Sequence, residues 1–498
     1  MTRPCTLAAS LVALALAWLP AVAVAAPDTF LAGTGRDGSR VVAGGDSVVN
    51  AYTRVTADVS SGDTEIAVAD ESIVADGDLV LIWQTVGLAA QVPGDPGPVD
   101  LRQASVGRWE LARVSTTAAL SVTLTAPMVR GYAADMTQMV RVPEYTTVTV
   151  QNSGRIIAAP WDPATNTGGI VAFFANGAIT LTGDVDASGA GFRGGLAVND
   201  ASAASGCSTE SEAAPVGAQR GEGLSSEYGA SSTGRGNLGS GGGGGVCVNS
   251  GGGGGGNGGI GGDGGRSEDG ARLVGGLGGA ALIAGTALER MTLGGGGGAG
   301  HIDDGWTSSI GHGGGAVLIR GQTLGGSGRI LADGEDAGGA VADGAAGGGA
   351  GGSVIVQLTS SGTCDVSATG GSGGPVDDDA GSGGGGGGGR VFLQADTGSS
   401  CPTDVSGGVS GENLSADPLG AQNGTDGALV ISAAGPLGLD SDGDLVPDSA
   451  ELDADTDSDE TMDVFDPDDD GDGIPTGDEQ PAHGTGDAAD WDGDVVPH

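Results

Sequence analysis

The sequence contains no lysine: its 19 basic side chains are all arginine, and they face 64 acidic side chains. Without a lysine amine there is no Schiff-base chemistry and no phosphate-loop lysine. The formal net charge of −45 argues against a nucleic-acid partner, because phosphate binding needs clustered cations. Aromatic residues make up only 3% of the chain and there are four histidines, which leaves little for an aromatic core or for general-base catalysis. Composition therefore points to no enzyme class.

Long apolar runs are also missing, except at the N-terminus. Arg3 precedes an apolar stretch at 7–19, and Ala23-Val24-Ala25 has the small-x-small pattern of a cleavage site. This pattern predicts a signal peptide over 1–25 and an exported protein, either secreted or held on the outer cell surface. No later stretch has the length of a membrane-spanning helix, so we expect no transmembrane segment in the mature chain.

Residues 26–160 are predicted to form an all-β module. Short β-branched segments lie between Gly, Pro, Asp and Ser turns, at 64–69, 78–83, 109–114, 120–124, 139–142 and 146–150. Residues 33–38 match the dinucleotide-binding pattern G-x-G-x-x-G. That motif requires a following helix, which the sequence does not indicate, so a glycine turn is the better interpretation.

Residues 161–436 repeat with a fixed period. Short apolar strands are expected at 316–319, 353–356 and 390–393, so that Val317, Val354 and Val391 are each 37 positions apart, and a fourth strand at 428–431 follows at 38. A second strand is expected at 328–332. Fixed spacing with no helical pattern between the strands predicts stacked parallel coils, that is, a glycine-rich β-solenoid.

An insertion at about 200–315 interrupts this solenoid and is dominated by glycine, with runs at 241–245, 251–256 and 294–298. Such a composition is typical of a flexible surface linker. The alternative is an ordered glycine-rich layer, since glycine lets backbones pack closely. Apolar residues that a linker does not need support this alternative: Leu273, Val274, Leu277, Leu282, Ile283, Leu288, Met291 and Leu293.

Four cysteines remain after Cys5 leaves with the signal peptide. An even number in an exported protein predicts two disulfides. Cys364 and Cys401 are 37 positions apart and so occupy one position in successive coils, at a separation of about 4.8 Å that suits a disulfide. Cys207 and Cys247 would then close the insertion.

The tail from 437 onwards is acidic, with 19 Asp, 3 Glu and no Arg between 440 and 498. Residues 468–479 carry oxygen ligands at positions 1, 3, 5, 7, 9 and 12 of a calcium loop and glycine at position 6: Asp468, Asp470, Asp472, Gly473, Ile474, Thr476 and Glu479. Alternating oxygens wrap one ion, glycine allows the sharp turn, and the last carboxylate closes the shell. The alternative is a solvated acidic tail without metal.

Two further loops repeat this ligand set, with Leu445 and Glu460 where glycine is preferred. Their ligands are Asp440, Asp442, Asp444, Val446, Asp448 and Glu451 in one loop, and Asp455, Asp457, Asp459, Thr461, Asp463 and Asp466 in the other. Asp490, Asp492 and Asp494 begin a fourth loop, which is incomplete before His498. Pro447, Pro467 and Pro475 interrupt the flanks, so these are calcium loops without EF-hand helices.

The tail resembles thrombospondin type 3 repeats over about 440–498. The resemblance implies a stalk of calcium loops that has little hydrophobic core and no regular secondary structure. This tail lacks the cysteines usual in the animal repeats.

A second resemblance covers roughly 28–435. The segments 30–38, 77–85, 140–145 and 187–195 are similar to parts of large exported bacterial surface proteins labelled adventurous gliding motility proteins. This resemblance implies a surface role in adhesion or gliding motility and no chemical reaction.

Other polar groups are weaker candidates for a site. His301, Asp303, Asp304 and His312 lie close in sequence and could hold a transition metal, but loop residues beside glycine runs are usually solvated. Asp333, Glu335 and Asp336, or Asp377, Asp378 and Asp379, could be the carboxylates of a solenoid glycosidase or lyase. Paired catalytic carboxylates face each other on a rigid surface, whereas these are neighbours in turns.

The sequence therefore predicts an all-β, exported structural or adhesive surface protein with no catalytic residues. The expected partners are calcium ions and cell-surface polysaccharide or other surface proteins. A polysaccharide-acting β-solenoid enzyme is the alternative. The incomplete fourth loop also suggests that further repeats or an anchor follow His498.

Overall fold

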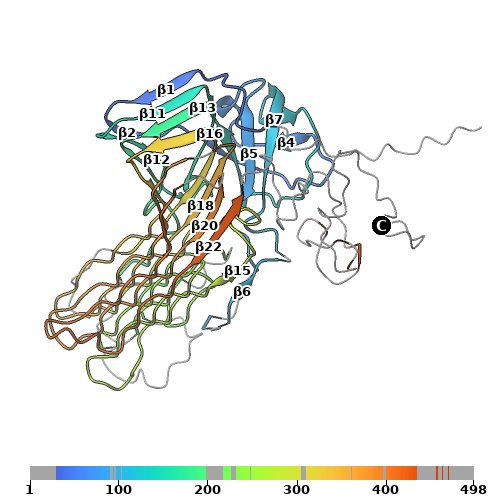
Figure 1. Ribbon diagram of the computed structural model, residues 1–498. Coiled ribbons are helices and arrows are strands. Elements are labelled where there is room, and N and C mark those ends of the chain that lie inside the picture. The colour runs from blue at the N-terminus through green and yellow to red at the C-terminus, as the bar shows by residue number, and fades with distance from the viewer. Residues whose placement is uncertain are drawn as a thin grey trace, which may run out of the picture.

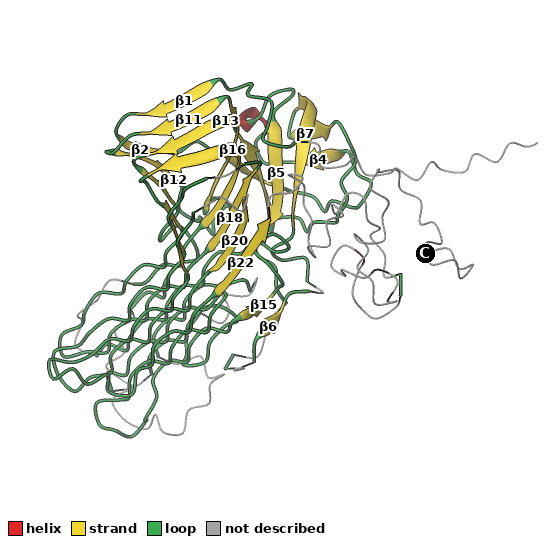
Figure 2. Ribbon diagram, in the orientation of Figure 1, coloured by secondary structure: helices red, strands yellow, loops and turns green. Residues whose placement is uncertain are grey.

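The computed structural model describes residues 30–89, 93–94, 97–102, 104–197, 217–225, 232–246, 248–303, 310–360, 362–395 and 400–433, with the single residues 456, 457, 463, 469 and 471. The predicted signal peptide, Cys207, Cys247 and most of the acidic tail lie outside this part. Within it the chain consists of strands, loops and turns (Figure 2), apart from the short 3-10 helix η1 (Glu71–Ile73).

Two parallel sheets form the body of the molecule, as the repeat predicts (Figure 1). The larger sheet contains, in order, β1 (Ser39–Val42), β11 (Thr147–Val150), β13 (Ile170–Leu181), β16 (Ala316–Gly326), β18 (Ser353–Leu358), β20 (Arg390–Ala395) and β22 (Ala428–Ala433), and β10 (Glu144–Tyr145) also pairs with β13. The smaller sheet contains β2 (Gly45–Ser47), β12 (Gly154–Ile157), β14 (Asp184–Asp186), β17 (Ile330–Leu331), β19 (Val366–Ser367) and β21 (Thr403–Asp404). Each coil before the one that contains β22 supplies one strand to each of these two sheets, which confirms the solenoid-like fold.

The strand register agrees with the sequence period. Val317 pairs with Val354, Val354 with Val391, and Val391 with Leu429. Equivalent side chains therefore stack in rows, and the rows that point toward the smaller sheet form one apolar core. The opposite face of the larger sheet belongs to a second core, which it shares with the module described next.

An antiparallel sheet forms the N-terminal module. Its strand order is β3 (Tyr52–Arg54), β9 (Thr137–Val142), β5 (Leu79–Gln84), β7 (Trp109–Ala118), β8 (Ser121–Leu124) and β4 (Glu65–Ala67). Five of the six segments expected to be strands in this region are strands of this sheet. The sixth, at 146–150, is β11 of the solenoid.

The module is thus shorter than the predicted range 26–160, because the solenoid begins at β1 and the module is inserted between β2 and β10. A period-two pattern looks alike in parallel and antiparallel strands, so the boundary could not be located from alternation. Residues 33–38 form turns that lead into β1, with Gly33, Gly35 and Gly38 at positive φ.

Polar contacts attach the module to the rest of the chain. The fully buried Glu144 carboxylate pairs with Arg113, and Arg141 pairs with both Asp37 and Asp78. The indole N–H groups of Trp83 and Trp109 donate to the carbonyls of Met291 and Leu288. A two-stranded parallel pair, β6 (Val99–Asp100) with β15 (Leu282–Ile283), adds backbone bonds at the same junction.

The glycine-rich segments form an ordered layer, which runs away from the sheets toward the lower left of Figure 1. Gly251 and Gly254 donate to the carbonyls of 265 and 262, Gly252 and Gly255 to those of 345 and 348, and Gly253 and Gly256 to those of 243 and 240. Every third residue therefore bonds to the same neighbouring segment. This is the three-residue turn of a polyproline II helix, which has no internal hydrogen bonds.

The same rule holds in the coils that were recognised by their period. Gly383, Gly386 and Gly389 donate to the carbonyls of 374, 371 and 368, Gly384 and Gly387 to 252 and 255, and Gly385 and Gly388 to 422 and 425. The described part of the insertion and the solenoid coils are thus interleaved in one layer, so the ordered alternative is the correct one for these residues.

Glycine is required there because the segments lie in contact. A Cβ placed on Gly255 would be 2.0 Å from the carbonyl oxygen of Gly295. Interior residues of the layer have neighbours in three directions, so no direction is left for a side chain.

Candidate functional site

The edge of the glycine layer farthest from the sheets carries residues with large side chains. In the described part of the chain, five turns, at 248–250, 266–273, 340–343, 376–380 and 412–420, join the extended segments there; we call them the distal edge. A segment such as 344–352, at 3.1 Å per residue, places this edge about 28 Å from the strands. The glycine runs themselves carry no side chains, so the side chains of these turns are available for contacts.

Hydrogen bonds join the five turns in a closed ring. The Arg266 N–H donates to Leu419 O (2.8 Å), Val376 N–H to Glu412 O (3.1 Å), Ala342 N–H to Asp377 Oδ1 (3.1 Å), and Asn249 Nδ2 to Ala342 O (3.0 Å) and to Glu268 Oε2 (3.1 Å). Beneath the ring, Ala340, Ala345, Val376, Ala380 and Leu419 form a small buried cluster. The edge is therefore an ordered surface rather than a set of independent loops.

Local side-chain bonds shape individual turns. Asn413 Oδ1 accepts from the N–H groups of Ser415 and Asp417, at 2.9 and 3.0 Å, which is the pattern of an Asx turn. In the turn at 266–273, the Asp269 carboxylate accepts from Ser267 Oγ and from the Ala271 N–H. The bond from Ser267 lowers the pKa of the Asp269 carboxyl. The sequence analysis named Leu273 and Asp377–Asp379 in these turns but did not predict that the turns form one edge, although larger residues interrupt the glycine at each turn.

The carboxylates considered for catalysis accept hydrogen bonds from backbone N–H and hydroxyl groups. Asp333 Oδ1 accepts from Ser367 Oγ (2.5 Å), Thr369 N–H (2.8 Å) and Thr369 Oγ1 (3.1 Å). Asp336 accepts from the Ser372 N–H at 2.6 Å, and Asp378 from the Ala380 N–H at 2.9 Å. The bonds of Asp333 and Asp336 hold one coil to the next, whereas the bond of Asp378 shapes its own turn.

The candidate transition-metal residues do not meet at one point. His301 Nδ1 accepts from the Asn249 N–H, whereas His312 Nδ1 accepts from the Gly194 N–H, both at 3.2 Å. Asp303 donates its N–H to Asp343 Oδ1, and Asp304 is outside the described residues. In the described ranges, no three His, Cys, Asp or Glu side chains are grouped to hold a metal ion.

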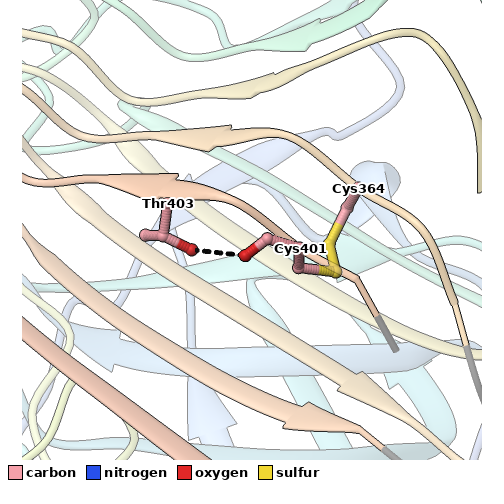
Figure 3. Close-up of a disulfide and its surroundings, with 3 residues drawn as sticks. All are labelled: Cys364, Cys401 and Thr403. Carbon is pink, nitrogen blue, oxygen red and sulfur yellow. Dashed lines mark hydrogen bonds between the residues drawn. A yellow bond between two sulfur atoms is a disulfide. The ribbon is translucent and has the colours of Figure 1, made fainter. Parts of the chain in front are cut away.

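Cys364 and Cys401 form a disulfide between successive coils, as the period predicts (Figure 3). Their Cα atoms are 4.5 Å apart and 37 positions separate them. Beside the bond, the Cys364 N–H donates to Ser400 O, and Thr403 Oγ1 donates to Cys401 O at 3.1 Å. The predicted Cys207–Cys247 pair stays a prediction.

Only fragments of the predicted calcium loops are described. Asp463 is almost fully buried, and its two oxygens accept from the N–H and Oγ1 of Thr456, each at 2.7 Å. Gly471 has φ +71°, and a Cβ there would be 2.5 Å from Asp457 Oδ2. The loops at 455–466 and 468–479 thus touch at this point. The other predicted ligands lie outside the described residues.

A cluster of buried charge lies where the module meets the layer. Burial raises the pKa of Glu110 to about 7, although its carboxylate accepts from the N–H groups of Val129 and Arg130. Burial likewise raises the pKa of Glu289 to about 7. The pKa of Arg290 is lowered to about 9 by burial and by repulsion from Arg108 and Arg130.

Comparison with known proteins identifies no family: no family model and no curated protein matches the chain. Among solved structures it is similar at a low level to three phage tailspikes. They are gp61 of Pseudomonas phage phi297 (10% identity, 72% of this chain, 57% of the tailspike, TM-score 0.14), Gp54 of Acinetobacter baumannii bacteriophage AP22 in complex with A. baumannii capsular saccharide (10%, 80%, 66%, 0.16), and gp49 of Pseudomonas phage LKA1 (9%, 78%, 64%, 0.15).

The chain spans about 57 to 66% of the length of these tailspikes. TM-scores this low support no conclusion about shape or activity. No helix in the described part of the chain is long and apolar enough to cross a membrane.

Proposed function

We propose that the protein is an exported structural or adhesive protein of the cell surface, with a calcium-stabilised stalk formed by its C-terminal tail. The observation that carries this proposal is the three-residue hydrogen-bond pattern of the glycine layer. Backbone groups in the layer are used for lateral bonding, and glycine has no reactive side chain. The layer can therefore stiffen the molecule and hold the distal edge away from the sheets, which is what an adhesive or structural protein needs.

The calcium stalk rests on the spacing of the tail. Three loops with alternating oxygen ligands bring many carboxylates together, with little apolar surface to offset chain entropy. Calcium would convert this repulsion into attraction, so ion binding and folding of the tail would be one process. The contact between Asp457 and the turn at Gly471 supports the packing of neighbouring loops.

Surface attachment of the native cells tests the first half of the proposal. A strain without the protein should attach to surfaces or glide less than wild type, and complementation should restore it. Antibody against the chain should also label intact cells. Normal attachment and gliding in the deletion strain, or turnover of a polysaccharide that is lost in Asp333→Asn and Asp336→Asn variants, would overturn it.

Limited proteolysis of the full chain with calcium or with EDTA tests the stalk. We expect the tail after 440 to be cut much faster in EDTA. Changing Asp468 and Glu479 to Ala removes both ends of the loop that carries the preferred glycine, so this variant should be cut with calcium present. Equal cleavage of the wild-type tail in calcium and in EDTA would contradict the calcium assignment.

A further inference from the structure

The distal edge exposes large apolar side chains on three of its five turns. Leu273 is 74% exposed, Val341 48% and Leu414 86%. The turns that carry them are not separate in space: the Arg266 N–H bonds to Leu419 O, so that the turns of Leu273 and Leu414 are neighbours. The turn of Val341 belongs to the same ring through its bonds to the turns of Asp377 and Asn249. Large exposed apolar side chains on one ordered edge, with polar residues on the same turns, are typical of a protein interaction site.

The polar residues around them are acidic. Glu268, Asp269, Asp377, Asp379, Glu412 and Asp417 are exposed on the same turns. The two arginines of these turns, Arg266 and Arg272, are partly buried. A partner must therefore bring positive charge to the rim, whereas nucleic acid, anionic lipid and acidic polysaccharide are repelled.

The edge is also ordered before any partner arrives. The ring of bonds through Asn249, Ala342 and Asp377 fixes the turns, and the apolar cluster below supports them. A preordered surface loses little entropy on binding, so that a few apolar anchors can give useful affinity.

We propose that the distal edge docks a cationic protein surface, which packs apolar side chains against Leu273, Val341 and Leu414 and places Lys or Arg against the acidic rim. This inference rests on the proposed adhesive function and names the partner class of the same molecule. The occupant is a protein because lipid and polysaccharide surfaces lack the combination of cationic and apolar side chains.

A displayed library of random peptides is the probe for this surface. The full chain is immobilised, and peptides are counter-selected against the variant L273S/V341S/L414S, whose changes lie at exposed positions. We expect enriched peptides that combine Lys or Arg with Leu, Phe or Trp. Enrichment of acidic peptides, or of none over the variant, would overturn the proposal.

Affinities of the enriched peptides provide the quantitative test. L273S/V341S/L414S should bind them about tenfold or more weakly. D379N/E412Q should bind them more weakly at low salt and like wild type at high salt. The matched control V41S/V48S/I260S removes three exposed apolar side chains elsewhere and should bind as wild type. Equal affinity of the edge variant and this control would contradict the assignment.

The attachment assay separates failure of this inference from failure of the proposed function. If cells without the protein attach normally, the adhesive function is wrong. If those cells lose attachment but cells carrying L273S/V341S/L414S attach as wild type, the protein is adhesive and the distal edge is not its docking surface.

Discussion

Individual glycines determine whether the layer can form. Interior residues such as Gly255 and Gly386 lie against backbone atoms of other segments: a Cβ at either would be 2.0 Å from a carbonyl oxygen. Backbone cannot move aside as the end of a flexible side chain can. The glycine content is thus a packing requirement of contacts between segments distant in sequence.

Changing Gly255 to Ala should therefore destabilise the protein by about 1–3 kcal/mol or more, because the new methyl group overlaps Gly295 O. Gly325→Ala is the matched control, since a Cβ there would lie 3.7 Å from Thr363 Oγ1, an ordinary contact. Its stability should stay within about 0.5 kcal/mol of wild type. Denaturant unfolding measures both. Equal stability of the two variants would mean that the backbone of the layer can shift to accommodate a methyl group at Gly255 without loss of stability.

Some elements could be predicted from the sequence and others could not, for a physical reason. The spacing of Val317, Val354 and Val391 predicts strands, their register and the Cys364–Cys401 bond, because each coil repeats one side-chain pattern. For the glycine-rich insertion, the sequence could not decide between a flexible linker and an ordered layer. Glycine has no side chain from which a neighbouring segment could be inferred. The sequence therefore gives no sign of the backbone hydrogen bond from the Gly255 N–H to the Gly348 carbonyl.

The disulfide is the covalent link between two elements, the coils that contain β18–β19 and β20–β21. Replacing both Cys364 and Cys401 by Ser should lower the free energy of unfolding by about 2–4 kcal/mol, because the bond closes a loop of 37 residues. Each single variant should lose as much as the double variant, and reduced wild type should behave in the same way. Wild type that melts alike with and without reductant would show that the bond contributes nothing to stability.

At the scale of the whole molecule, stability depends on how the module sits against the layer. The module contributes Trp83 and Trp109, whose indoles bond to the segment at 288–291, and Glu110 on the same strand as Trp109. Glu289 belongs to the segment that these indoles contact. Arg390 of the solenoid strand β20 donates to the Arg290 carbonyl in the same segment. One junction therefore joins the solenoid, the layer and the module, and it holds the buried Glu110 and the partly buried Glu289.

This junction makes the stability of the molecule depend on pH. The pKa of Glu110 and that of Glu289 are each raised from 4.5 to about 7 by burial. Between pH 4.5 and 7 the folded protein therefore binds more protons than the unfolded chain, so stability falls as pH rises and levels off above 7. We expect the denaturant midpoint at constant calcium to fall from pH 5 to pH 7.

Replacing Glu110 by Gln removes one of these groups and should flatten the pH dependence by about half, leaving the part that belongs to Glu289. Glu65→Gln is the control, because Glu65 is exposed and its change should leave the full pH dependence. A denaturant midpoint of the wild type that rises from pH 5 to pH 7 would contradict this prediction. An unchanged pH dependence of the midpoint in Glu110→Gln would show that burial of the protonated Glu110 carboxyl is not its cause. A slope that flattens only in Glu110→Gln would place the pH sensitivity at the contact between module and layer.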